Sequence, residues 1–182
     1  MMTVRSGPRS LSGRAAHAMS SIQRRVTWPI VVHSVRTAVA GVASLLVARL
    51  FKLPEAYWAP ITTIVITQSS LGAALAVSWQ RFVGTLLGAV IGAIVASHFG
   101  PHALVFGASL FILGVLRVLM HLDLTAYRFA GVALAIIVLV PRTGSAWQIA
   151  IHRFIEVSIG IGVALIMSVL WPEREDVPAG RG

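Results

Sequence analysis

Six apolar blocks, separated by charged residues or by Pro and Gly, make up most of this chain and limit what it can fold into. They cover residues 30–50, 57–71, 81–98, 103–121, 125–141 and 150–171. Only 12% of the residues are charged, whereas an ordinary soluble domain has about 25%. Lipid admits helices or closed barrels, and the period-two alternation of barrel strands is missing from the sequence of these blocks. The blocks therefore predict an all-α integral membrane protein with six transmembrane helices.

The basic residues predict the topology. Six of the fifteen lie in the first 36 positions: Arg5, Arg9, Arg14, Arg24, Arg25 and Arg36. This clustering is the positive-inside signal, so we expect both termini in the cytoplasm and no nucleic-acid partner. Residues 1–27 are predicted to be a basic, disordered cytoplasmic tail, with a transit peptide as the alternative. Residues 28–172 form the predicted membrane domain, and residues 173–182 a short polar cytoplasmic tail.

The chain repeats itself. The phrase "RFVGTLLGAVIGA" at 81–93 returns as "RFIEVSIGIGVA" at 153–164, with an offset of 72. "YWAPITTIVI" at 57–66 has a fainter counterpart in "YRFAGVALAI" at 127–136, with an offset of 70. A unit with an odd number of spans reverses direction when it is repeated. We therefore predict two three-helix repeats of inverted topology.

Small residues form a stripe in the third helix of each predicted repeat. The stripe consists of Gly84, Gly88 and Gly92 in the first repeat, and of Gly160, Ala164 and Ser168 in the second. Small residues at this spacing let helix backbones approach closely in lipid. We expect Gly84, Gly88, Gly92, Gly160 and Ala164 to serve helix packing.

A carboxylate interrupts the second stripe. Glu156 lies four residues before Gly160 and aligns with Gly84, so it is predicted to face neighbouring helices. An acidic residue inside a membrane is costly and suggests a function, with Arg153 as its nearest partner in sequence. The sequence leaves open whether Glu156 is a proton carrier or one half of a structural ion pair with Arg153.

Three arginines are candidates for an anion path. Arg36 lies inside the first apolar block, where it could also extend its side chain to the cytoplasmic surface. Arg81 and Arg153 are predicted to open their helices at the N-terminal end, where the helix dipole already attracts anions. Arg81 is equally explained as a cytoplasmic anchor, whereas Arg153 falls on the predicted outer side.

The second apolar block carries unusual polarity. Its polar residues are Thr62, Thr63, Thr67, Gln68 and Ser69. Thr63, Thr67 and Gln68 could line a water-filled pathway. Alternatively, the threonine hydroxyl groups could donate hydrogen bonds to carbonyls of their own helix. Tyr57 and Trp58 are interpreted as aromatic residues of the membrane interface, with substrate stacking as the alternative.

Metal and cofactor chemistry is not predicted. The chain has no Cys, which excludes disulfides and thiolate catalysis. His98 and His102 are spaced by four residues, but Gly100 and Pro101 break the helix that such a metal site would need. Phosphate-binding loops, nucleophile elbows and zinc motifs are missing from the sequence. We expect no enzyme, metal or cofactor.

The stretch "LPEAYWAPITTIVITQSSLGAALAVSWQRFVGTLLGAVIGA" at 53–93, with the closing "RFIEVSIGIGVALIMSVLWP" at 153–172, resembles the fusaric acid resistance or aromatic acid exporter family. The resemblance covers roughly 30–172 and implies six spans in a bacterial cytoplasmic membrane. It implies export of small aromatic or other organic acids, with proton coupling in some relatives. It also implies a distant likeness to plant aluminium-activated malate transporters, which are dimeric anion channels.

The expected partners are membrane lipid and a small organic anion. The chain ends soon after Trp171, so the resemblance also leads us to expect that the large cytoplasmic domain of longer relatives is missing and that two copies assemble as a dimer. The preferred function is an organic-acid exporter, possibly driven by protons. A passive organic-anion channel and a non-transporting membrane subunit are the alternatives.

Overall fold

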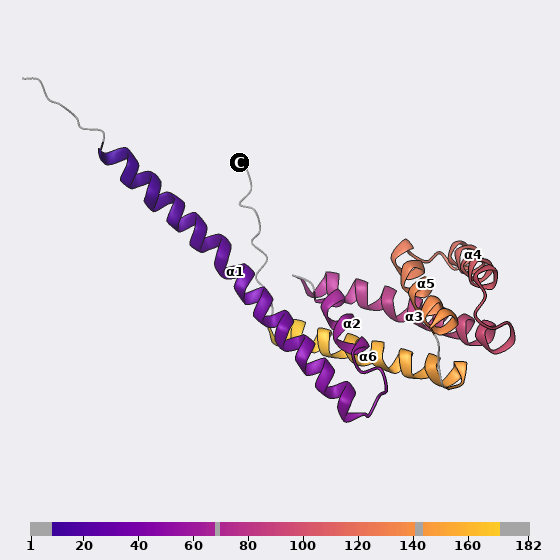
Figure 1. Cartoon of the computed structure of the whole chain (residues 1–182). Helices are drawn as coiled ribbons and strands as arrows, with labels where there is room; N and C mark the ends of the chain where they lie inside the picture. Colours follow the sequence, from indigo (N-terminus) through magenta and orange to yellow (C-terminus); the bar gives the residue numbers. More distant parts are fainter. Residues whose placement is uncertain (1–8, 68–69, 141–143, 172–182) are drawn as a thin grey trace, which may run out of the picture. The chain divides into compact units, whose positions relative to one another are not determined.

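The computed structural model describes residues 9–67, 70–140 and 144–171, with side chains from residue 30 onward. Its elements in chain order are α1 (Arg9–Leu50), α2 (Trp58–Ile66), α3 (Leu71–His98), α4 (Ala103–Leu119), α5 (Leu124–Leu139) and α6 (Ala146–Leu170) (Figure 1). The described residues form helices and turns without strands, so the all-α prediction is confirmed. The chain divides into two units, residues 1–36 and 37–182, and the second holds α2 to α6.

The first helix begins earlier than the sequence analysis predicted. α1 starts at Arg9, in the segment predicted to be a disordered tail. Most residues between 9 and 27 are good or moderate helix formers, such as Ala, Arg, Met and Gln, and no Pro interrupts them before Pro29. High charge therefore did not prevent a helix in this segment. The predicted tail at 173–182 lies outside the described residues.

Three helical segments are long and apolar enough to cross a membrane: Ile30–Leu50, Leu71–His98 and Ala146–Leu170. Two shorter apolar helices, Ala103–Leu119 and Leu124–Leu139, have 17 and 16 residues. At about 1.5 Å per residue these two are roughly 25 Å long, slightly less than the hydrocarbon core of about 30 Å. α2 has only 9 residues.

α3 is the central helix of the second unit. α3 packs against α5 and α6, while α2 packs against α6. α3 and α6 run in opposite directions side by side (Figure 1). Both helices are capped at their N-termini: the Ser70 hydroxyl accepts from the Ala73 N–H, and Ser145 forms a capping box with Gln148.

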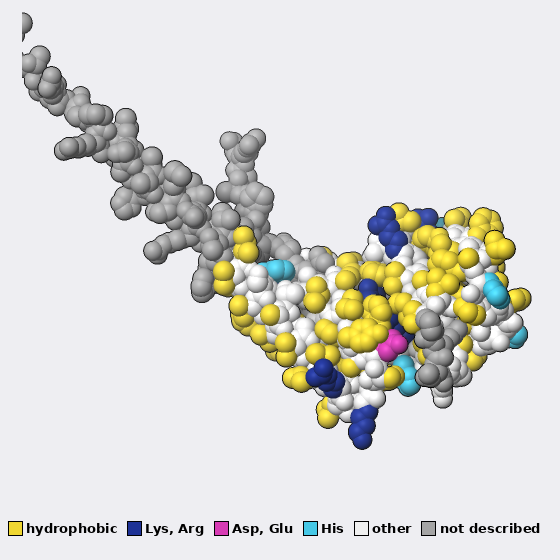
Figure 2. Space-filling view, viewed as in Figure 1, with side chains coloured by type: hydrophobic (Ala, Val, Ile, Leu, Met, Phe, Trp, Pro, Cys, Tyr) yellow, Lys and Arg dark blue, Asp and Glu magenta, His cyan; other side chains and the backbone are white. Residues whose placement is uncertain are grey.

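Many large apolar side chains face outward, and most of the buried apolar residues are small. The buried core is rich in Ala, including Ala59, Ala74 and Ala93, which are fully buried. Leu104, in contrast, is 88% exposed, and hydrophobic side chains cover much of the described surface (Figure 2). A soluble monomer rarely exposes such large apolar patches. This distribution fits a protein whose solvent is lipid and whose helices associate through small residues.

Candidate functional site

Two buried arginines meet at one small pocket between α3, α5 and α6. The pocket has a cavity volume of about 10 Å³, which is about the minimum needed for one water molecule. Its lining residues are Arg81, Thr85, Phe129, Val132, Ala133, Arg153 and Val157. The structure thus brings together two of the three arginines that the sequence singled out.

Arg81 is held by one hydrogen bond and one ring. Its side chain is 6% exposed, and its Nε donates to the Thr62 Oγ1 across 3.2 Å. Its guanidinium carbon lies 4.7 Å from the centre of the Phe129 ring, a cation–π geometry. A guanidinium has five N–H donors, and the bond to Thr62 uses one of them.

Arg153 lies against Trp58. Its side chain is 3% exposed, and its guanidinium carbon is 3.3 Å from the centre of the Trp58 ring. Its NH1 atom is buried and has no hydrogen-bond partner within the described part of the chain. A buried charge without full hydrogen bonding is expensive. Arg153 therefore has capacity for an acceptor that the described residues do not supply.

Glu156 bonds to the segment before α2 and not to Arg153. It is 1% exposed, and its Oε1 accepts from the Glu55 N–H across 3.2 Å. Its Oε2 has no hydrogen-bond partner among the described residues. Among these residues Glu156 and Arg153 form no direct ion pair, although they are three positions apart in α6. The Glu156 carboxylate bonds to Glu55, and the Arg153 guanidinium lies against Trp58.

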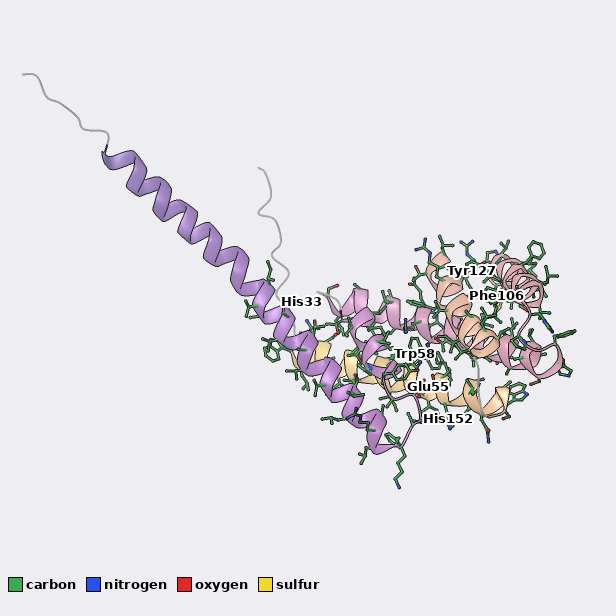
Figure 3. The ribbon with its side chains drawn as sticks, viewed as in Figure 1. His33, Glu55, Trp58, Phe106, Tyr127 and His152 are labelled. Carbon is green, nitrogen blue, oxygen red and sulfur yellow. The ribbon has the colours of Figure 1, made fainter. Side chains whose placement is uncertain are left out.

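Residues at the start of α2 link Arg153 and Glu156 of α6 through a chain of contacts. The Trp58 Nε1 donates to the half-buried Glu55 carboxylate across 2.9 Å. Glu55 is anchored by Glu156, and Trp58 covers Arg153. Glu55 and Trp58 are labelled beside α6 in Figure 3. We call Glu55, Trp58, Arg153 and Glu156 the Trp58 latch.

The polar residues of α2 divide into two groups. Thr63 donates to the carbonyls of Ala59 and Gly160 across 3.0 and 3.1 Å, and Thr67 donates to the Thr63 carbonyl across 2.7 Å. These hydroxyls therefore bond to helix carbonyls and are not among the residues that line the pocket. Thr62 is the member that contacts Arg81. Gln68 lies outside the described residues.

Arg36 is 1% exposed. It is the last residue of the first unit, residues 1–36, whereas the pocket belongs to the second unit. Its suggested part in an anion path therefore stays a prediction.

The small-residue stripes lie at helix contacts inside the chain. A Cβ on Gly84 or Gly88 would collide with the carbonyl of Ala126 or Ala130 in α5, and a Cβ on Gly92 would approach Ile137 at 3.1 Å. A Cβ on Gly160 would come within 2.5 Å of the Ala59 carbonyl in α2. A second copy of the chain therefore cannot use these glycines unless it displaces α2 or α5.

The sequence analysis missed Glu55 and Phe129. A usable signal for Glu55 was its position in "PEAYW", an acid three residues before Trp58 at the start of a helix. Phe129 carries no local signal, because its contact with Arg81 joins residues 48 positions apart. Trp58, interpreted as an interface aromatic, contacts an arginine of the site.

Comparison with known proteins identifies a family model and several relatives that match this chain. The family model described as fusaric acid resistance protein-like matches residues 40–167. The "Putative arylamide transporter" of Mycobacterium tuberculosis is 32% identical over 84% of this chain and 43% of its own length. "Inner membrane protein YeeA" of Escherichia coli is 33% identical over 88% of this chain and 47% of its own length.

A plant protein is also similar. The "Aluminum-activated malate transporter 14" of Arabidopsis thaliana is 30% identical over 64% of this chain and 24% of its own length. The chain thus spans less than half the length of these relatives. No solved structure matches. The family model covers well over half of the chain, so the resemblance seen in the sequence is confirmed. This chain belongs to the fusaric acid resistance protein-like family.

Proposed function

We propose that this protein moves small organic anions, aromatic acids among them, outward across the bacterial cytoplasmic membrane. The observation that carries the proposal is the pair of buried arginines, Arg81 and Arg153, on one pocket. The names of the relatives add support, because they describe transporters of arylamide and malate and an inner-membrane protein.

The chemistry of the pair favours an anion. Two cations line the pocket, and the buried NH1 of Arg153 has no partner among the described residues. A carboxylate can accept two parallel hydrogen bonds from one guanidinium, which would offset the cost of burying the charge. The apolar walls formed by Phe129, Val132 and Val157 would contact the rest of an organic acid.

The architecture of this transporter is six spans in two inverted repeats, with both termini in the cytoplasm. A pseudo-twofold axis would exchange α3 with α6 and α2 with α5, so each contact of α3 with α5 should have a counterpart between α6 and the α2 region. The main helix contacts support this exchange, since α3 packs on α5 and α6 packs on α2.

The register of individual contacts supports the repeat further. Three contact pairs correspond: Arg81·Phe129 with Arg153·Trp58, Gly84·Ala126 with Glu156·Glu55, and Gly88·Ala130 with Gly160·Ala59. In each pair the α6 residue follows its α3 counterpart by 72 positions, and the α5 residue follows its counterpart at the start of α2 by 71. The agreement of three contact pairs on these two offsets favours a repeat over chance similarity of glycine-rich apolar segments, with an offset of 71 for α2 and α5 in place of the 70 taken from the sequence.

Glu156 is the proton carrier in this proposal. It is buried, it lies one helical turn from Arg153, and its Oε2 has no partner among the described residues. A proton on Glu156 and an anion on the arginines would then occupy neighbouring places. Two copies of the chain form the working unit and meet through a face outside the glycine stripes, which can be checked by cross-linking in native membranes.

The decisive experiment is uptake of labelled hydroxybenzoate into proteoliposomes with and without an imposed pH gradient. Gradient-dependent accumulation above equilibrium supports a proton-coupled carrier. Flux that only equilibrates, and that follows voltage, indicates a passive channel. Arg81→Gln and Arg153→Gln should each abolish flux, whereas Arg128→Gln, at an exposed arginine of α5, should not. Lack of flux in the wild-type protein contradicts the proposal and favours a non-transporting subunit.

A further inference from the structure

Each arginine of the pocket is covered by an aromatic ring from the opposite repeat. Trp58 at the start of α2 covers Arg153 of α6, and Phe129 of α5 covers Arg81 of α3. The two rings are 71 positions apart, which is the register of the other contacts between the proposed repeats. They are therefore equivalent positions in the two repeats.

The two rings are held very differently. Trp58 lies 3.3 Å from its arginine, and the Glu55 carboxylate binds its indole N–H. Phe129 lies 4.7 Å from its arginine and lines the pocket, and it has no polar group through which it could be tied. The counterparts of Glu55 and Glu156 in the other repeat are Ala126 and Gly84, which have no carboxylate.

We infer that Trp58 and Phe129 are the gating residues of the anion site, one toward each membrane face, and that the Trp58 gate alone is latched through Glu55 and Glu156. This inference rests on the proposed function and its inverted repeats. In the proposed topology the joint between α1 and α2 is outside and the joint between α4 and α5 is inside. Trp58 would then close the site from the outer face, and Phe129 from the cytoplasm.

The latch gives the gate a defined way to open. While the indole lies 3.3 Å from the Arg153 guanidinium, it covers one face of that group and hinders the approach of an anion from the outer side. For the indole to leave, either its bond to Glu55 or the bond between Glu55 and Glu156 must break. At the other end, Phe129 can leave by a ring movement alone, because only van der Waals and cation–π contacts hold it.

The absence of Cys from the sequence permits a direct test. Thr85→Cys places a single thiol in the pocket lining with little change in volume. Its reaction with an anionic, membrane-impermeant methanethiosulfonate is then timed in right-side-out and inside-out vesicles. Trp58→Ala should accelerate labelling from the outer face, and Phe129→Ala from the cytoplasmic face, each by about tenfold or more, because a desolvated cation–π contact is worth at least that factor in an open–closed equilibrium. The effect of Trp58→Ala should be the larger of the two, because the latch is lost with the indole.

Matched variants test whether the loss of any aromatic side chain would change the labelling rate. Trp147→Ala and Phe111→Ala remove exposed aromatic side chains of α6 and α4 and should leave labelling unchanged. Trp58→Phe keeps a ring over Arg153 and should stay close to the parent. If Trp58→Ala does not fold, Glu55→Gln replaces it, because it weakens the latch on the indole and should accelerate labelling from the outer face only.

Adding benzoate to the labelling reaction distinguishes a failure of the gating inference from a failure of the proposed function. Protection of the thiol by benzoate, together with opposite sidedness of the two variants, supports both. Opposite sidedness without protection supports the gates and refutes benzoate binding at the arginines. Protection with equal acceleration from both faces, or with no acceleration, overturns the gates and leaves the anion site standing.

Discussion

The contact between α6 and α2 gives a prediction that can be worked out from the structure. Gly160 faces α2 so closely that an added Cβ would lie 2.5 Å from the Ala59 carbonyl oxygen and 2.6 Å from the Thr62 Cβ. The carbonyl oxygen is backbone and cannot rotate away. Gly160→Ala must therefore push the two helices apart, in the region where Thr62 bonds to Arg81.

The expected cost follows from two opposing effects. Overpacking a close contact costs about 1–3 kcal/mol, while Ala in place of Gly within a helix gains about 1 kcal/mol. Gly162→Ala is the matched control, because it lies two residues further along α6 and an added Cβ there meets nothing within 4 Å. The control should be neutral or more stable, and Gly160→Ala should be less stable than the control by about 1–3 kcal/mol.

The difference can be measured by titrating the purified protein with SDS in mixed micelles and following helicity by circular dichroism. The apparent free energy of unfolding is compared between the two variants. Equal unfolding curves for Gly160→Ala and Gly162→Ala would mean that α2 does not pack on α6 as described, and the proposed repeat register would lose one of its three contact pairs.

Three further outcomes are expected. Glu156→Gln should abolish accumulation driven by a pH gradient yet leave the elution profile unchanged, since Gln still offers an oxygen to the Glu55 N–H; full uphill uptake by this variant would exclude the carrier role. Thr62→Val should lower the free energy of unfolding in the same SDS titration by about 1.5–3 kcal/mol, the usual worth of a hydrogen bond to a charged group, unless Arg81 finds another acceptor. Ser145→Ala should cost about 1 kcal/mol through loss of the α6 cap, whereas Ser158→Ala, whose hydroxyl only bonds back to Phe154, should be nearly neutral in that titration.

The helices were predictable because hydropathy is a local property. Each predicted block overlaps a described helix, and the polar end of the second block explains why α2 stops at Ile66, just before Thr67. The predicted start of α3 at Arg81 was wrong, because Ser70 caps a helix that begins at Leu71, and α6 begins at Ala146, so neither Arg81 nor Arg153 opens its helix. The helical start of α1 at Arg9 was missed because charge and disorder were equated. The stripe Gly84, Gly88 and Gly92 marked a contact face, but nothing local indicates that α5 fills it.

The site was predictable only in part, because its contacts join distant segments. Arg81, Arg153 and Glu156 stood out as charges in apolar surroundings. Their partners depend on the rotation of each helix, which the packing of α2 and α5 decides. An ion pair between Arg153 and Glu156 was one of two alternatives left open by their spacing in sequence, and in the structure Arg153 lies against Trp58 while Glu156 accepts from Glu55.

In the proposed repeat, a carboxylate is present in one copy only. Glu156 takes the place of Gly84 there: Gly84 lets the Ala126 carbonyl of α5 approach, while Glu156 accepts from the Glu55 N–H just before α2. Two equivalent gates would open with equal free energy. A hydrogen bond to a carboxylate adds about 1.5–3 kcal/mol to one of them, which changes the ratio of the two open states by about ten- to a hundredfold. In the proposed transporter the gate held by the latch therefore opens less often than the gate held by a phenyl ring alone, while the gradients across the membrane set the direction of net transport.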